Sequence, residues 1–240
     1  MSILFDLIRD LMTKKKMPSP VQPGACDDKR SDLGQRVFLN VGGGSKHIQV
    51  PSHYSGWEHV LLDIDPATDA DVVCDARNLE KFEANQYDAI YCSHNLEHYY
   101  HHDVRRVLRG FLHVLKEDGF AEIRVPDIGN LLHFMVERNL GLHDIVYQSP
   151  AGPIAIHDIL WGYGRQIEES GVDFYAHKTG FTSGSILDAL TQAGFMEVVM
   201  LEPCALFELH LVGFMQTPTA DQLDLFGDKT ISRHKVDSAN

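Results

Sequence analysis

One run of residues indicates how this chain folds: Val37-Phe38-Leu39-Asn40-Val41-Gly42-Gly43-Gly44-Ser45, followed later by His59-Val60-Leu61-Leu62-Asp63-Ile64-Asp65. Each part is a short apolar run, rich in β-branched residues, that ends in turn-forming residues, which is typical of a parallel strand covered on both faces of its sheet. Three glycines after the first strand allow a tight turn and let a ligand approach the backbone closely. A carboxylate at the end of the neighbouring strand can accept both hydroxyls of a ribose. The two strands therefore predict a nucleoside site.

The spacing of the glycines separates two classes of cofactor. A dinucleotide fingerprint G-x-G-x-x-G that began at Gly42 would need a glycine at position 47, where the chain has His47. The third glycine, which allows close packing of helix and strand, is missing. A nicotinamide dinucleotide is therefore disfavoured.

Further motifs follow in order at residues 71–76, 87–98 and 106–120. With the glycine loop, these motifs resemble the class I S-adenosylmethionine (SAM)-dependent methyltransferases of the type 11-like group, over residues 36–126 and again over 177–214. The resemblance implies an α/β fold with a doubly wound, seven-stranded, mostly parallel Rossmann-like sheet whose last strand is antiparallel. It also implies SAM as the cofactor, held by Asn40, Gly42, Gly43, Gly44, Asp63, Ile64, Asp75, Ala76 and Ser93.

Among these residues, Asp63 ends the apolar run directly, so we expect it to bind the ribose and Asp65 to be a turn residue. Asp75 is expected beside the adenine, and it can also cap a helix. Asn40 and Lys46 depart from the family pattern, which has an acid at the first position and often a glycine at the second.

The composition and the net charge limit the classes of substrate and partner that the chain can bind. The chain has 240 residues, a formal net charge of −13 and a sequence pI of about 5.4, so its overall field repels phosphate backbones and anionic membranes. A nucleic-acid substrate is disfavoured and a small-molecule acceptor is favoured; a homo-oligomer is compatible with the sequence. The four cysteines show no C-x-x-C spacing, and no apolar run is long enough for stable membrane insertion or for an export signal. We therefore expect a reduced, cytoplasmic protein.

Three segments are expected along the chain. Residues 1–32 would form an N-terminal helix, over residues 3–12, and a proline-containing linker. Residues 33–216 would form the SAM-dependent methyltransferase domain, with a helical lid at 129–176 inserted after the fifth strand, where it would cover the cofactor crevice. Residues 217–240 would form a polar, loosely held tail.

The chemistry is expected at two places. The resemblance implies that His94 and His98 line the methyl-transfer face as catalytic residues, and histidine is suited to take a proton near neutral pH. No metal is expected, because His94 and His98 share a helical face but no third ligand stands at a reliable spacing. The acceptor is expected to bind residues of the lid and of the segment after it, namely Tyr147, His157, Trp161, His177 and Lys178; for the lid residues, simple packing onto the sheet is an equal alternative, and His177 and Lys178 could instead pin the lid.

Together these features predict an enzyme that transfers a methyl group from SAM to an unidentified small molecule by O- or N-methylation. The alternative is a non-catalytic SAM-binding or partner-binding protein on the same fold.

Overall fold

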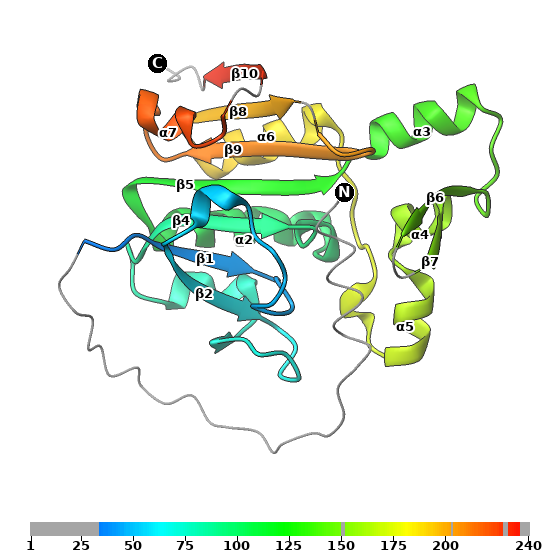
Figure 1. Cartoon of the computed structure of the whole chain (residues 1–240), viewed down its shortest axis with the longest axis horizontal. Helices are drawn as coiled ribbons and strands as arrows, with labels where there is room; N and C mark the ends of the chain where they lie inside the picture. Colours follow the sequence, from blue (N-terminus) through cyan, green and yellow to red (C-terminus); the bar gives the residue numbers. More distant parts are fainter. Residues whose placement is uncertain (1–33, 150–151, 203, 228–229, 236–240) are drawn as a thin grey trace.

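One eight-stranded sheet organises the computed structural model, which describes residues 34–149, 152–202, 204–227 and 230–235 (Figure 1). The strand order is β10-β8-β9-β5-β4-β1-β2-β3. The strands are β1 (Val37–Val41), β2 (Glu58–Asp63), β3 (Val72–Val73), β4 (Tyr87–Ser93), β5 (Leu115–Pro126), β8 (Glu197–Glu202), β9 (Glu208–Phe214) and β10 (Thr230–Lys235).

The direction of the strands agrees with the predicted doubly wound α/β fold. Strand β1 pairs in parallel with β2 on one side and β4 on the other, and β4 pairs in parallel with β5. Strand β9 is antiparallel to both β5 and β8. The order of the chain reverses between β1 and β4, so the carboxyl ends of these two strands flank the crevice in which such folds bind ligands.

Two long helices cover one face of the sheet. Helix α2 (His101–Val114) buries a stripe at helical spacing, and α6 (Ser183–Ala193) packs beside it through Ile186 and Leu190. The Thr182 side chain caps α6, and Gly194 ends it at a φ of 122°. The opposite face is covered by Tyr54, which ends the 3-10 helix η1 (Ser52–Tyr54), and by the segment that includes α7 (Ala220–Asp224).

The C-terminal segment is more ordered than the predicted polar tail. Leu223 and Phe226 are buried against the sheet, and β10 pairs with β8 in antiparallel register. Strand β8 would otherwise be an edge strand with free backbone N–H and C=O groups, and β10 satisfies them. The prediction of a loosely held tail over 217–240 is therefore wrong for its described part, and the sheet gains an eighth strand.

The lid lies beyond the carboxyl ends of β1, β2, β4 and β5 (Figure 1). It consists of α3 (Ile128–Glu137), the hairpin β6 (Ile145–Ser149) and β7 (Gly152–Ala155), α4 (Ile156–Trp161), α5 (Gly164–Ser170) and the 3-10 helix η4 (Asp173–Tyr175). The lid has an apolar cluster of its own around Leu131, Ile154, Ile156 and Ile159, which Phe207 joins. It is thus mixed in structure, where the sequence predicted helices alone.

The predicted N-terminal helix and Cys26 lie outside the described residues. Cys74 and Cys92 are free thiols, as expected of a reduced protein. Among the described residues, the helices are too short or too polar to cross a membrane.

Candidate active site

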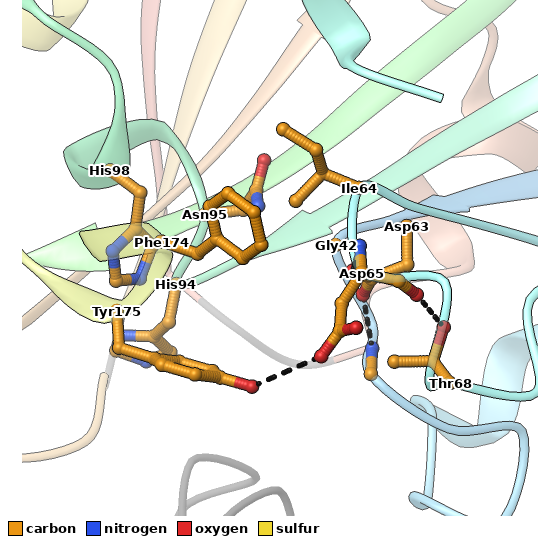
Figure 2. A pocket seen from close by; sticks show the side chains of 11 residues that line it. Gly42, Asp63, Ile64, Asp65, Thr68, His94, Asn95, His98, Phe174 and Tyr175 are labelled. Carbon is orange, nitrogen blue, oxygen red and sulfur yellow. Dashed lines mark hydrogen bonds between the residues drawn. The ribbon is translucent and has the colours of Figure 1, made fainter. Parts of the chain in front are cut away.

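A cleft opens where the carboxyl ends of β1, β2 and β4 meet the last part of the lid (Figure 2). Its empty space, which includes open solvent at the mouth, is about 480 Å³. Its lining comes from three strand ends and from η4: Gly42, Gly44, Asp63, Ile64, Asp65, Thr68, His94, Asn95, His98, Phe174 and Tyr175.

The glycine loop has the conformation that its sequence requires. Gly42 and Gly44 have φ values of 70° and 68°, which side chains other than glycine rarely adopt. A Cβ at Gly42 would overlap the side-chain amide of Asn95, and one at Gly43 would overlap Asn40. Both positions therefore require glycine, because the side chains of Asn95 and Asn40 already occupy the space that a Cβ would take.

Asp63 is buried beneath this loop. Its Oδ2 accepts a hydrogen bond of 2.9 Å from the Gly44 N–H, and its Oδ1 accepts one of 2.9 Å from the Asp65 N–H. Burial raises the pKa of Asp63, and these backbone hydrogen bonds oppose the rise. Each carboxylate oxygen has two lone pairs, so both can still accept a ribose hydroxyl. Asp63 thus shapes the loop as well as facing the cleft.

Asp65 has a role that the sequence did not indicate. Its side chain accepts a hydrogen bond from the Ala67 N–H at 2.8 Å, as a turn residue does. Its Oδ2 also lies 3.5 Å from the hydroxyl of Tyr175 on η4. This contact joins the end of β2 to the lid (Figure 2).

Asn40 is buried below the loop and does not line the cleft. Its Nδ2 lies 3.1 Å from Nε2 of His59, and its side chain packs under Gly43. The structure therefore places Asn40 as a support of the glycine loop. Ser93 also lies outside the cleft lining, at the end of β4.

A second cleft, with an empty space of about 720 Å³ that includes open solvent, shares Ile64, Asn95, His98 and Phe174 with the first, so the two are adjacent. Asp75 lines it and also caps the 3-10 helix η2 (Ala76–Lys81) by accepting from the Arg77 N–H at 2.9 Å.

The expected cap by Asp75 is confirmed, and its expected position beside the adenine stays a prediction. Burial would raise the pKa of Asp75, but its hydrogen bonds with Arg77 outweigh burial and lower it. Ala76 is buried beside it and does not line the cleft.

His94 is held between two carboxylates. Its Nε2 lies 3.0 Å from Oε2 of Glu208, and its Nδ1 lies 3.5 Å from Oε1 of Glu97. Burial would lower the pKa of His94, but Glu208 and Glu97 outweigh burial and raise it to about 9. A protonated imidazole has no lone pair with which to take a proton, so this arrangement does not support the expected role of His94 as a base.

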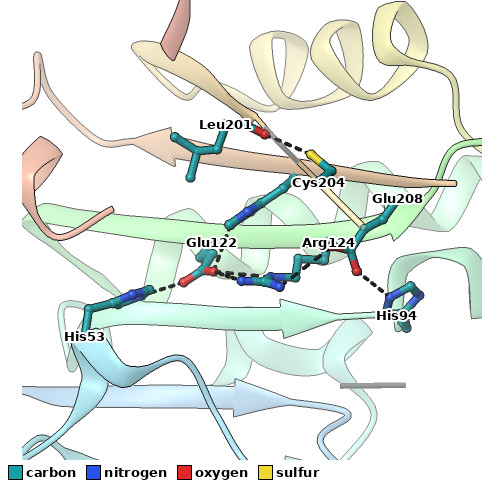
Figure 3. A network of polar contacts seen from close by, with 8 residues as sticks. His53, His94, Glu122, Arg124, Leu201, Cys204 and Glu208 are labelled. Carbon is teal, nitrogen blue, oxygen red and sulfur yellow. Dashed lines mark hydrogen bonds and ion pairs between the residues drawn. The ribbon is translucent and has the colours of Figure 1, made fainter. Parts of the chain in front are cut away.

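A buried polar network extends from His94 across the sheet (Figure 3). Arg124 lies 3.7 Å from Glu208 and 3.1 Å from Glu122. Glu122, fully buried, also binds Nε2 of His210 and Nε2 of His53, each at 2.8 Å. The sequence did not lead us to this network. Charged residues two apart on β5 and on β9 indicate that each strand has a polar face. Which of these residues meet across the two strands depends on the register, and the sequence does not give the register.

His98 meets His177 at the base of the cleft. The two ring centroids are 4.9 Å apart, and Nδ1 of each ring faces a backbone carbonyl, that of Ala176 for His98 and that of Ile159 for His177. Burial lowers the pKa of His177 to about 4. The segment is anchored there because the Lys178 N–H donates to the Glu97 carbonyl at 2.8 Å.

The remaining residues predicted to contact the acceptor are separated. Lys178 lines the second cleft, with its Nζ 3.6 Å from Asp173. Tyr147 packs against the apolar cluster of the lid, and His157 and Trp161 contact each other on α4 with ring centroids 5.0 Å apart.

Tyr147, His157 and Trp161 line neither described cleft. Phe174 and Tyr175 are the residues of η4 that line the first cleft. The sequence offered no signal for them, because a short 3-10 helix has no long periodic pattern.

Comparison with known proteins agrees with this geometry. Residues 39–123, which run from β1 to β5, match the family model described as "Methyltransferase domain". No curated protein matches the chain. Among solved structures, the chain is similar to a SAM-dependent methyltransferase from Archaeoglobus fulgidus, at 16% identity and a TM-score of 0.49, over 75% of this chain and 86% of that one.

The chain is also similar to the 1,6-didemethyltoxoflavin-N1-methyltransferase of Burkholderia thailandensis, a structure with bound S-adenosylhomocysteine. The identity is 17% and the TM-score 0.45, over 75% of this chain and 72% of that one. Likeness at this level indicates no acceptor.

The fold and the cleft define a doubly wound α/β protein with a nucleoside site at its topological switch point. The match to the methyltransferase-domain family over residues 39–123, which include that cleft, supports a class I SAM-dependent methyltransferase with SAM as its cofactor.

Proposed function

We propose that this enzyme methylates an oxygen or nitrogen of a small molecule that binds between the end of β4 and residues 174–177. One observation carries the proposal. The cleft is continuous from the glycine loop and Asp63, which suit the cofactor, to His98 and Tyr175, which suit an acceptor.

The cofactor would lie across the carboxyl ends of β2, β1 and β4. Asp63 would accept the ribose hydroxyls, and the second cleft beside Ile64 and Asp75 would hold the adenine. SAM supplies a methyl group on a positively charged sulfur. Several carboxylates line or border this space, and their field favours such a cation. The methyl group would then face Asn95 and His98.

The protein would act mainly by alignment. Good orientation of two reacting groups can contribute roughly 7–11 kcal/mol to lowering a barrier. The Nδ1 of His98 faces the Ala176 carbonyl and donates to it, so Nε2 is left to accept a hydrogen bond from the acceptor. Tyr175 and Phe174 would close the cleft over the acceptor. Within residues 129–176, it is thus the last short helix, η4, that would cover the acceptor.

Release of S-adenosylhomocysteine, measured against pools of small hydroxyl and amine compounds, tests this function. Tyr175→Ala should lower acceptor turnover at least tenfold. Trp161→Ala, a second aromatic residue of the lid that lies outside both clefts, should behave like the parent. If Trp161→Ala lost turnover and Tyr175→Ala did not, the acceptor would bind elsewhere on the lid. If no compound were methylated although SAM bound, the alternative of a non-catalytic SAM-binding protein would be supported.

A further inference from the structure

Three potential metal ligands converge at the base of the cleft. Glu97 and His98 belong to the 3-10 helix η3 (Leu96–His98) that follows β4, and His177 follows η4. One ligand atom from each side chain lies within 4.8 Å of the other two. Glu97 and His98 thus belong to the segment after β4, and His177 belongs to the segment after the lid. The hydrogen bond from the Lys178 N–H to the Glu97 carbonyl joins these two segments.

The Glu97 carboxylate is buried without a hydrogen bond. Its residue is 1% exposed, and neither carboxylate oxygen has a hydrogen-bond partner among the described residues. His94 is an ion-pair partner of Glu97, with its Nδ1 3.5 Å from Oε1, but it also pairs with Glu208. Burying a carboxylate is strongly unfavourable unless a cation or several hydrogen-bond donors compensate it. Because His94 is shared between two carboxylates, it compensates Glu97 only in part, and lone pairs of the Glu97 carboxylate remain for a bound cation.

The two imidazoles have the orientation that metal ligands require. Nδ1 of His98 donates to the Ala176 carbonyl at 3.2 Å, and Nδ1 of His177 donates to the Ile159 carbonyl at 3.0 Å. Each Nε2 is therefore left with its lone pair. Metal-binding histidines commonly donate their other ring N–H to a backbone carbonyl in this way, which fixes the tautomer and the angle of the ring.

We propose that Glu97, His98 and His177 bind one divalent first-row cation, with Zn²⁺ the best match, beside the methyl-transfer position. Two imidazoles and one carboxylate form a donor set of catalytic zinc sites, which keep an open coordination position. With metal–ligand bonds of about 2.1 Å, tetrahedral ligand atoms lie about 3.4 Å apart, so side-chain shifts of about one ångström close the site.

The cation would deepen the proposed function, on which this role rests. It would take the Nε2 lone pair of His98, and the acceptor would then bind the cation in place of that nitrogen. An acceptor hydroxyl bound at the open position would lose its proton to water more readily. Its oxygen would then form the new bond to the methyl carbon as the carbon–sulfur bond of SAM breaks, with the electron pair remaining on sulfur. A site of this kind selects for acceptors with a metal-binding oxygen.

Calorimetric titration with Zn²⁺ tests the site directly. The full chain, treated with a chelator and then freed of it, should bind one Zn²⁺ with a micromolar or lower Kd. His177→Ala and Glu97→Gln should each weaken this binding at least 100-fold. His133→Ala removes an exposed histidine of the lid and should change nothing. Circular dichroism checks the folding of each variant, and His98→Ala provides a third ligand variant if one of the others does not fold.

Measurements of SAM binding and of turnover on the same chelator-treated protein distinguish the metal site from the proposed function. Chelator-treated protein should still bind SAM, while turnover of an identified acceptor should fall at least tenfold and return with added Zn²⁺. If SAM bound but Zn²⁺ did not, or if the ligand variants bound Zn²⁺ like the parent, the metal site would be wrong and the methyltransferase function would stand. Failure to bind SAM with Zn²⁺ binding intact would overturn the function and leave the metal site.

Discussion

Replacing Glu122 by Gln should remove much of the stability that the buried network contributes. The carboxylate is fully buried and accepts hydrogen bonds from His53 and His210 at 2.8 Å and from Arg124 at 3.1 Å. Each hydrogen bond to a charged group is worth about 1.5–3 kcal/mol, and the three are not additive. Removing one partner of a buried ion pair costs about 3–5 kcal/mol, and we expect a loss of this size at pH 7.

The effect should depend on pH in a defined direction. Burial would raise the pKa of Glu122, but His210, His53 and Arg124 outweigh it and hold the pKa well below the ordinary value of 4.5. A carboxylate whose pKa is lowered by folding stabilises the folded protein. This contribution is complete at pH values above the pKa of the unfolded state, and it is lost as the pH falls through the lowered pKa of the folded state. The difference between parent and Glu122→Gln should therefore be constant from about pH 7 to pH 5 and shrink below about pH 4.

Urea denaturation followed by circular dichroism measures this difference. The matched control is Glu137→Gln on α3, which removes an exposed carboxylate paired with His133 and should leave the denaturation midpoint unchanged. A loss below about 1 kcal/mol for Glu122→Gln, or a difference that grows on acidification, would refute the reasoning.

Two further predictions concern the cofactor edge of the cleft. Asp63→Ala should weaken SAM binding in calorimetry by about 2–5 kcal/mol, because it removes the acceptor of both ribose hydroxyls and releases the Gly44 N–H. Asp65→Ala should lose much less, and a reversed order would move the ribose to Asp65. Gly42→Ala should lower SAM affinity at least tenfold, since its φ of 70° disfavours alanine and the new Cβ overlaps Asn95. The control Gly184→Ala adds a methyl group in open space on α6 and should raise stability by up to about 1 kcal/mol with SAM affinity unchanged; equal losses of affinity in both glycine variants would contradict this reading.

Local patterns in the sequence were sufficient for the frame of the site. The apolar run and the glycines after it predicted a buried strand and a tight turn, and the structure has a buried strand at Val37–Val41 followed by Gly42 at a φ of 70°. Such features depend on neighbouring residues in the chain, whose geometry is the same wherever the segment lies.

The chemistry of the site depends on residues far apart in the chain. His94 and His98 had the spacing of a metal-binding pair, but no third ligand stood at a reliable spacing, because His177 reaches His98 from beyond the lid. Trp161 was expected to contact the acceptor because of its residue type, yet it lines neither of the two clefts.

Glu122 and His210 show the same limit. They lie on different strands, and the antiparallel register of β5 and β9 brings them within 2.8 Å. Packing of the whole chain determines the register of the strands, the position of the lid and the burial of each residue. It therefore determines which polar groups are removed from water and must form hydrogen bonds with one another.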